Sequence, residues 1–362
     1  MSRSVGQRDI QINRRGFSAI ELLVALSIIG VLVALGLPAI VKARSAARRG
    51  ECQSHLRVLA LAMTAEGDQS RRLPASGNIG VDASGNFSHF HSWVVSLMAG
   101  LDQATIAKQW DWNKPSVDPA NQALALTHLK VLVCPEDDTQ VGHGDLSYVV
   151  NGGFGWTAVL SGVSDCPVSP AGQPLDLNGN GVGCPSNVIS DGAPGDKLLF
   201  LQTGVFFLEN WQTAPPCTIR HHRLDSIFDG LSQTIFLSEN IRAGADPALP
   251  EQTWASPLAN RNSFVLSLSN ICPGASCAPG TVDYSRTNQG LGAINSGRDE
   301  AEGEAAWPNS HHSGGVHFAF GDGRVVFANE RIDGRVYASL VSPQGTLIQG
   351  ELRQHLVSGD EL

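Results

Sequence analysis

A run of twenty uncharged, mostly apolar residues, 22–41, constrains this chain more than any other feature. An α-helix rises about 1.5 Å per residue, so a run of this length matches the roughly 30 Å hydrocarbon core of a bilayer. Its one proline, Pro38, is a residue that membrane helices tolerate. The chain is therefore expected to carry one membrane-length helix near its amino terminus.

The residues beside the run indicate whether it is cleaved off or retained in the mature protein. In a secretory signal peptide a small residue follows the apolar core, whereas here the small residue, Gly16, precedes it. The run is therefore expected to stay in the mature protein. Charge does not set its orientation, because four arginines precede the run and four basic residues follow it closely.

Residues 14–21, Arg-Arg-Gly-Phe-Ser-Ala-Ile-Glu, resemble the type IV prepilin signal shared by pilins and pseudopilins. The resemblance implies cleavage after Gly16 by a prepilin peptidase, methylation of the new terminus at Phe17, and an assembly role for Glu21. In this family the glutamate pairs with the amine of the first mature residue, on the same or a neighbouring subunit. The alternative is that Glu21 lies at headgroup depth, where a carboxylate needs no partner.

The same resemblance implies a location and partners. Residues 1–16 would be a cytoplasmic leader and residues 17–41 a single pass through the inner membrane, with the carboxyl-terminal domain in the periplasm or at the cell surface. The partners would be the prepilin peptidase, the lipid bilayer, and other pilin-like subunits or further copies of this chain. A type II secretion or type IV pilus-like assembly is the expected setting.

Residues 42–66 favour an amphipathic continuation of the same helix. Helix-forming residues dominate, and one apolar stripe recurs at spacings of three and four on an otherwise charged segment. The stripe consists of Cys52, Leu56, Leu59, Ala60 and Met63. It is expected to pack on a sheet, and Gly67 is expected to end the helix.

Residues 67–362 are expected to form an α+β domain of pilin-like plan, with the long helix packed on an antiparallel sheet that carries large loop-rich insertions. Short apolar runs predict strands at 131–134, 146–150, 198–208, 234–237, 263–268, 316–320 and 324–328. Helices are expected at 90–98, 120–129 and 335–342. The last two strands form the clearest hairpin, because Asp322 and Gly323 suit a two-residue turn.

Composition indicates a loop-rich, acidic body. Only 16% of the 362 residues are charged, 39 are glycine and 19 are proline, and the formal net charge is −9. Residues 1–16 hold four arginines and one aspartate, so their removal would take the net charge to −12. An acidic body argues against nucleic-acid binding, which needs a basic face.

Seven cysteines favour an oxidising compartment. The candidate disulfides are Cys272 with Cys277 and Cys166 with Cys184, which are close in sequence, and Cys52 with Cys134, which are distant. Cys217 would be left over. A zinc site is the competing interpretation, although no two cysteines have the C-x-x-C spacing.

Residues 312–325 resemble the carboxyl-terminal signature of a large family of domains of unknown function, abundant in planctomycete bacteria, in which nine residues separate a histidine from Asp-Gly. The matching residues are His312, Gly314, Gly315, Asp322 and Gly323. Further matches are Cys52 with Leu56, residues 147–153 and residues 229–240. Members commonly begin with a prepilin-type helix, so the two resemblances support one architecture, but they imply no activity.

The histidines near this signature allow two interpretations. The titratable candidates, as metal ligands or as an acid and a base, are His311, His312, His317, Asp322 and Glu239. A structural role is favoured, because Gly314 and Gly315 allow close backbone approach and His312 can hydrogen-bond a turn or loop. The sequence shows no nucleophile elbow, phosphate-binding loop or H-E-x-x-H helix, so no enzyme is expected.

One segment could bind calcium, and no other cofactor is expected. Asp176, Asn178 and Asn180 place oxygen atoms at alternate positions before Gly181, as in the first half of a calcium loop. The twelfth position is Asn187 rather than a bidentate glutamate, so binding would be weak unless Asp191 or another residue completes the site. A plain turn within a loop is the alternative.

Three classes of function follow from the sequence. The leading expectation is a pseudopilin-like structural subunit. The second is an envelope binding module for glycan, peptide or protein that uses the pilin route only as a tether, and the large body favours some such added role. The third is an envelope enzyme, for which the histidine cluster is the only argument.

Overall fold

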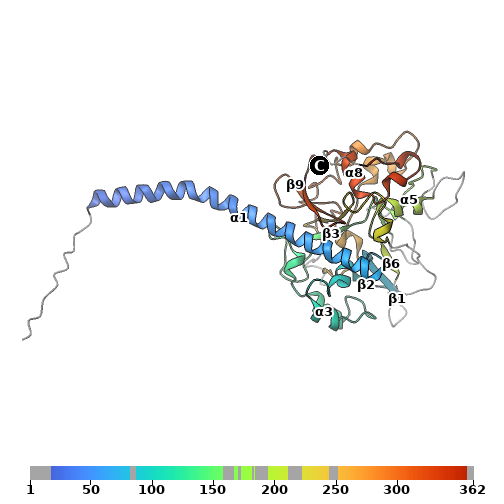
Figure 1. The fold of residues 1–362 in the computed structure, drawn as a ribbon, viewed down its shortest axis with the longest axis horizontal. Helices are drawn as coiled ribbons and strands as arrows, with labels where there is room; N and C mark the ends of the chain where they lie inside the picture. Colours follow the sequence, from blue (N-terminus) through green and yellow to red (C-terminus); the bar gives the residue numbers. More distant parts are fainter. Residues whose placement is uncertain are drawn as a thin grey trace, which may run out of the picture. The chain divides into compact units, whose positions relative to one another are not determined.

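The computed structural model describes residues 18–81, 87–157, 167–169, 173–181, 183, 195–210, 222–243 and 252–356. By its internal contacts the chain divides into two units, residues 1–47 and 48–362. One helix, α1 (Ala19–Ser70), contributes to both units (Figure 1).

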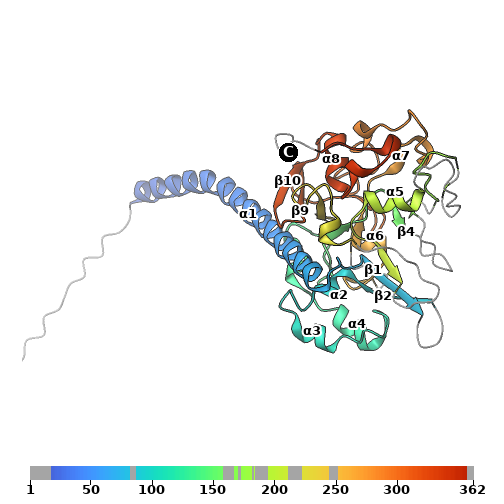
Figure 2. The same ribbon diagram turned by 45° about the vertical axis from the view of Figure 1, so that its right-hand side comes forward.

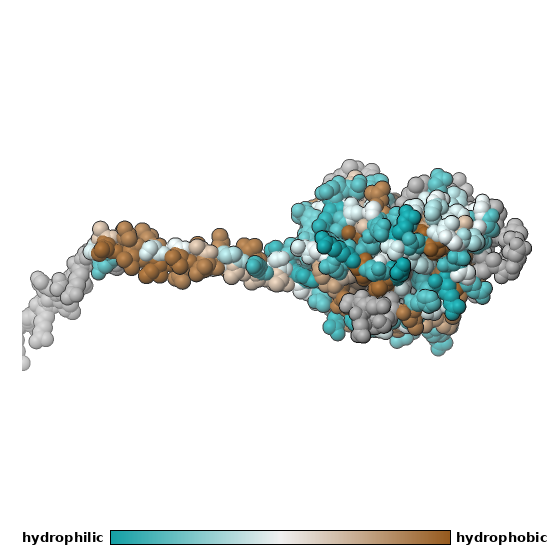
Figure 3. All heavy atoms as spheres, turned by 90° about the horizontal axis from the view of Figure 1, so that it is seen from above, coloured by the Kyte–Doolittle hydropathy of each residue, from teal (hydrophilic) through white to brown (hydrophobic). Residues whose placement is uncertain are grey.

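In the first unit, α1 begins with a reciprocal capping box. The Ser18 N–H donates to Glu21 Oε2 at 2.9 Å, and the Glu21 N–H donates to Ser18 Oγ at 3.3 Å. None of residues 18–47 is buried, and Leu23 and Leu35 are 66% and 70% exposed. Figure 3 shows this part of the helix with a largely brown, apolar surface. Among the described residues, α1 is the one helix long and apolar enough to cross a membrane.

Residues 48–70 of α1 belong to the second unit, where the predicted apolar stripe is buried. Its five predicted members have no exposed surface, and Gly67 joins them. The prediction that Gly67 ends the helix is wrong, because α1 continues to Ser70. A Cβ at Gly67 would lie 3.0 Å from Leu73 Cδ2, so the glycine serves close packing rather than helix termination.

The main sheet has five strands in the order β10-β9-β7-β3-β8. Their bounds are Tyr148–Asn151 (β3), Ile235–Glu239 (β7), Ser263–Phe264 (β8), Gly315–Phe320 (β9) and Val325–Asn329 (β10). All neighbours pair antiparallel except β3 and β8. The predicted hairpin around Asp322 and Gly323 is confirmed as β9 and β10.

Two smaller sheets and several short helices complete the described part of the domain (Figure 2). The further strands are Gly77–Val81 (β1), Phe87–Ser92 (β2) and Leu208–Asn210 (β6), in the order β2-β1-β6, and Trp156–Thr157 (β4) with Pro167–Val168 (β5). The α-helices are Trp93–Leu97 (α2), Ala104–Gln109 (α3), Pro119–Ala125 (α4), Asp196–Thr203 (α5), Ala259–Asn262 (α6), Leu268–Ile271 (α7) and Gly334–Val341 (α8). The 3₁₀ turns are Lys130–Leu132, Leu224–Ser226, Pro273–Ala275, Tyr284–Arg286, Gly345–Leu347 and Gly350–Leu352.

The main sheet is covered on both faces. Along β3, Tyr148 and Val150 pack in one cluster with the α1 stripe, whereas Val149 packs in a second cluster with α8. Strand β9 divides in the same way, since Ala319 belongs to the α1 cluster and Phe318 stacks on Tyr337 of α8. The stripe therefore packs on a sheet as predicted, and the mixture of helices and sheets is α+β.

Two predicted strands begin with helical residues in the structure, and the second of them reaches strand β6 only at its last residue, Leu208. Residues 198–203 belong to α5, where Leu199, Phe200 and Thr203 are buried and Leu198 is 52% exposed, which is helical spacing. Residues 131–134 begin in a 3₁₀ turn. Short apolar runs do not distinguish a strand from a buried helix, which explains both errors.

The other differences concern element ends. The predicted helix at 90–98 starts as strand β2, and Ser92 caps the shorter α2 through a 3.2 Å hydrogen bond from the Val94 N–H. The predicted strand at 263–268 keeps only β8 before α7 begins at Leu268. The helices predicted at 120–129 and 335–342 correspond to α4 and α8.

Candidate functional site

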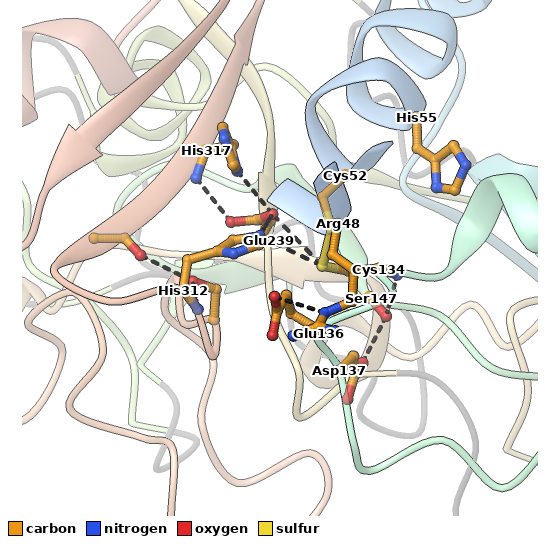
Figure 4. Close-up of polar contacts among 12 residues, drawn as sticks. Arg48, Cys52, His55, Cys134, Glu136, Asp137, Ser147, Glu239, His312 and His317 are labelled. Carbon is orange, nitrogen blue, oxygen red and sulfur yellow. Dashed lines mark hydrogen bonds and ion pairs between the residues drawn. A yellow bond between two sulfur atoms is a disulfide. The ribbon is translucent and has the colours of Figure 1, made fainter. Parts of the chain in front are cut away.

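Five of the residues singled out in the sequence converge where α1 meets the main sheet (Figure 4). Glu239 ends β7, and His317 lies on β9 between residues that face α8, so its side chain points to the α1 face. His312 lies in the segment before β9, and the disulfide between Cys52 and Cys134 adjoins all three. We call these five residues the helix-anchor cluster.

Glu239 is the centre of the helix-anchor cluster. Its Oε1 accepts hydrogen bonds from His312 Nε2 at 3.1 Å and His317 Nδ1 at 3.0 Å, and its Oε2 accepts from the His317 backbone N–H at 2.8 Å. An ionised carboxylate only accepts, so both imidazole nitrogens carry a proton. Glu239 and His317 are each 1% exposed and His312 is 3% exposed. The carboxylate therefore ties β7 to two points of the signature segment.

The disulfide fastens α1 to this carboxylate site. Cys134 Sγ lies 3.5 Å from His312 Nε2 and 3.9 Å from Glu239 Oε1. The Cys134 N–H donates to Ser147 Oγ at 3.1 Å, and the Ser147 hydroxyl donates to Asp137 Oδ2 at 2.5 Å. The predicted pairing of Cys52 with Cys134 is confirmed, and closing so long a loop stabilises the fold by about 4 kcal/mol.

The Asp-Gly turn of the signature docks on the same helix. Gly323 has φ +82°, and a Cβ there would lie 2.7 Å from Leu61 Cδ2 of α1. The Thr64 hydroxyl of α1 donates to the Gly321 carbonyl at 3.1 Å. Asp322 shapes the turn by accepting from the Arg324 N–H at 2.9 Å.

Strand β10 is the sheet edge beside the helix. The Arg49 guanidinium lies 3.4 Å from the centre of the Phe327 ring, and Gln53 Nε2 donates to the Val325 carbonyl at 3.3 Å. Helix α1 thereby covers an edge that would otherwise invite further strands. Sequence reasoning missed Arg49, Gln53 and Phe327. The alternation of His317 with Phe318 was the available signal that one face of this hairpin meets the helix.

Gly314 and Gly315 allow the close backbone approach that was predicted at the start of β9. Gly314 has φ +84°, and a Cβ at Gly315 would lie 1.9 Å from the Ala328 carbonyl oxygen of β10. Nearby, Arg298 Nη2 donates to the His312 carbonyl at 2.9 Å. His311 pairs instead with Asp138 at 3.1 Å, so the structure separates it and Asp322 from Glu239.

Two fully buried groups lower the stability in acid, whereas Glu302, whose pKa burial raises to about 7, acts in the opposite direction between about pH 7 and 4.5. Burial alone would raise the pKa of Glu239, but hydrogen bonds and charge from His312 and His317 outweigh it and lower this pKa to about 2. Burial lowers the pKa of His91 to about 4, against a small opposing effect of Glu209. An unfolded chain would protonate both groups at higher pH than the folded chain does.

We therefore expect His91 and Glu239 each to contribute one step in which the free energy of unfolding falls as the pH falls. Between about pH 6.5 and 4, His91 is protonated in the unfolded state but not in the folded state. Between about pH 4.5 and 2 the same holds for Glu239. Each difference lowers the free energy of unfolding by on the order of 3 kcal/mol. Denaturant unfolding across this range measures both. Because Glu302 opposes His91 over much of this range, the His91 step is measured as the difference between the wild type and His91→Phe. A pH profile that His91→Phe leaves unchanged from about pH 6.5 to 4 would contradict the assignment.

The predicted calcium segment forms a turn that closes on itself. Asp176 accepts from the Asn180 and Gly181 N–H groups and from the Ser276 hydroxyl. Sequence reasoning missed Asp196, which accepts from the backbone of the same turn and whose pKa burial raises. Asn187 and Asp191 lie outside the described residues. Calcium binding here stays a prediction.

Calcium is tested by thermal unfolding. A site with a Kd of about 1 mM would gain about 1.4 kcal/mol at about 10 mM calcium, and Asp196→Asn should abolish the gain. Magnesium at the same concentration is the control. An unchanged midpoint in calcium would leave the segment as a plain turn.

Several predicted residues cannot be placed. Gly16, Phe17, Cys166, Cys184 and Cys217 lie outside the described residues. Glu21 is described, and its contact in the full chain is the Ser18 capping box. The predicted disulfide between Cys272 and Cys277 is confirmed.

The fold and site define a class: an α+β domain fastened by a buried carboxylate and a disulfide to a long apolar amino-terminal helix. A family model described as "Protein of unknown function (DUF1559)" matches residues 41–335, and the chain belongs to this family. The matched region contains the whole helix-anchor cluster. No curated protein and no solved structure matches the chain.

Proposed function

We propose that this chain is a pseudopilin-like, membrane-anchored structural subunit that a prepilin peptidase processes. In this proposal residues 17–41 lie in the inner membrane, and the domain lies in the periplasm or at the cell surface. The setting is a type II secretion or type IV pilus-like assembly, with other pilin-like subunits or copies of this chain as neighbours. The in-register Gly16, Phe17 and Glu21 support the processing step.

One observation carries the proposal: α1 is a single helix whose two parts have opposite surroundings. Its apolar residues from Ile20 to Val41 are exposed, whereas its stripe from Cys52 to Gly67 is fully packed. Exposed apolar surface of this length is unfavourable in water, so lipid or neighbouring helices are the expected surroundings. A helix that both assembles with other subunits and carries a domain needs one exposed apolar part and one part that packs on the domain.

The helix-anchor cluster supports a structural role rather than an enzymatic one. Its carboxylate and both imidazoles are at most 3% exposed, so in this fold a substrate does not reach them. A covalent bond and a buried ionic contact instead join the helix to the sheet. Such a joint transmits force between an assembled helix and the domain that it carries.

A tethered binding module is the second candidate, and one surface feature favours it. A hollow of about 730 Å³ lies between α8 and the end of the described chain, a volume suited to a ligand. Its lining is polar and of mixed charge, so a polar glycan or peptide is the fitting ligand; the charged residues are Arg335, Arg353, Asp283 and Asp333. If the helix serves only as a tether, the domain should still bind this ligand when assembly of the helices is blocked.

Shearing of cells followed by high-speed sedimentation separates the two candidates. A filament subunit should appear in the sheared pellet as antibody-labelled fibres. A tethered module should stay with the membranes and leave them in detergent as single subunits. Recovery of single subunits alone, from cells that express the native partners, would contradict the proposed assembly.

A further inference from the structure

We propose that reduction of the Cys52–Cys134 disulfide turns the helix-anchor cluster into a tetrahedral site for one zinc ion. Cys52, Cys134, Glu239 and His312 each offer one ligand atom, and the four atoms lie within 4.8 Å of one another. All four residues are buried, at no more than 3% exposed. This site is separate from the proposed filament function and does not depend on it.

The donor set is the first argument. Two thiolates, one imidazole and one carboxylate are ligands that structural zinc prefers, at about 2.3 Å for sulfur and about 2.0–2.2 Å for nitrogen and oxygen. A tetrahedron of this size needs the sulfurs about 3.8 Å apart. The Cα atoms of the two cysteines are 5.0 Å apart, so side-chain rotation provides this separation once the S–S bond is broken.

The supporting contacts are the second argument. His317 donates to Glu239 from both its ring and its backbone N–H, which fixes the carboxylate that would bind the metal. Arg298 holds the backbone of His312. Partners that orient ligands in this way strengthen metal binding, so His317 is a positioning residue and not a ligand.

The chemical step balances with a dithiol as reductant. Two electrons from the dithiol break the Cys52–Cys134 bond, the dithiol becomes a disulfide, and its two protons leave two thiols on the protein. Zinc then displaces one proton from each thiol. His312 takes the tautomer with its proton on Nδ1, which ends its hydrogen bond to Glu239 and frees Nε2 to bind the metal, and Glu239 binds through Oε1. Two thiolates and one carboxylate around Zn²⁺ leave a net charge of −1.

Cobalt provides the test, because thiolate-bound tetrahedral cobalt has characteristic visible and near-ultraviolet absorption. The full chain in detergent is reduced with a dithiol, the dithiol is removed without oxygen, and cobalt is titrated. We expect one tetrahedral cobalt per chain, displaced by zinc, and no such spectrum from the oxidised chain. Cys52→Ser with Cys134→Ser should abolish the thiolate band.

Matched variants locate the site. Cys272→Ser with Cys277→Ser should leave the spectrum intact, because among the described residues no other group of three or more ligands converges. His312→Gln should lose the four-ligand spectrum, and His317→Gln should keep it with roughly 10- to 100-fold weaker affinity. Absence of the spectrum from reduced wild-type chain, or its survival in the Cys52 and Cys134 double variant, would overturn the proposal. A chain that loses its native circular dichroism on reduction and does not regain it with metal also counts against it.

Discussion

Glu21→Gln should abolish filament recovery while leaving cleavage after Gly16 unchanged. A carboxylate beside an apolar membrane segment is costly unless it is paired, and in the proposed mature subunit its partner is the amine of Phe17. A hydrogen bond to a charged group is worth about 1.5–3 kcal/mol, so its loss weakens each subunit contact by roughly 10- to 100-fold. Over many contacts this should prevent assembly, as measured by sedimentation of sheared material.

The capping box of α1 provides the matched control. Glutamine in place of Glu21 can still accept from the Ser18 N–H, so Glu21→Gln keeps the cap and removes the charge. Ser18→Ala does the reverse, because it removes the hydroxyl that accepts from the Glu21 N–H. We expect Ser18→Ala to assemble. Equal loss in both variants would assign Glu21 to helix capping, and normal filaments from Glu21→Gln would contradict its proposed role.

Glu239→Ala should be the most destabilising single substitution in the sheet. It leaves two buried imidazole donors and one backbone N–H without their acceptor, and breaking a buried ionic contact costs about 3–5 kcal/mol. Denaturant unfolding of the detergent-solubilised chain measures this loss. We also expect the substitution to weaken the joint with α1, because His312 would no longer be held beside the disulfide.

The control for this prediction is Glu351→Ala, which removes an exposed carboxylate and should change the free energy of unfolding by less than about 0.5 kcal/mol. Glu239→Gln should fall between the two, because an amide oxygen accepts but carries no charge. A loss below about 1 kcal/mol in Glu239→Ala would show that the carboxylate does not hold the sheet together.

Local patterns in the sequence predicted several parts of this fold. The stripe of α1 follows from helical spacing, and the β9–β10 hairpin follows from alternation around Asp322 and Gly323. Cys272 and Cys277 pair because they are near in sequence. The strands predicted at 131–134 and 198–208 failed because each rests on runs of only four apolar residues, which carry no clear period.

The helix-anchor cluster was only partly accessible to sequence reasoning. Sequence reasoning grouped Glu239, His312 and His317 and paired Cys52 with Cys134, but it did not bring the two groups together. It disfavoured a zinc site because no two cysteines have the C-x-x-C spacing. The structure brings Cys52, Cys134, Glu239 and His312 together from four distant segments. That convergence depends on strand order, with β7 placed between β3 and β9, and no local spacing encodes it.

The most direct measurement of the proposed function is the mass of the amino-terminal peptide of the protein purified from its native envelope. Processing as a pseudopilin predicts a mature chain that begins at Phe17 with a methylated amine and retains the apolar segment of α1. A chain that keeps Met1 would contradict the prepilin interpretation. A chain cut beyond residue 41 would identify the segment as a removed signal sequence and would equally contradict it.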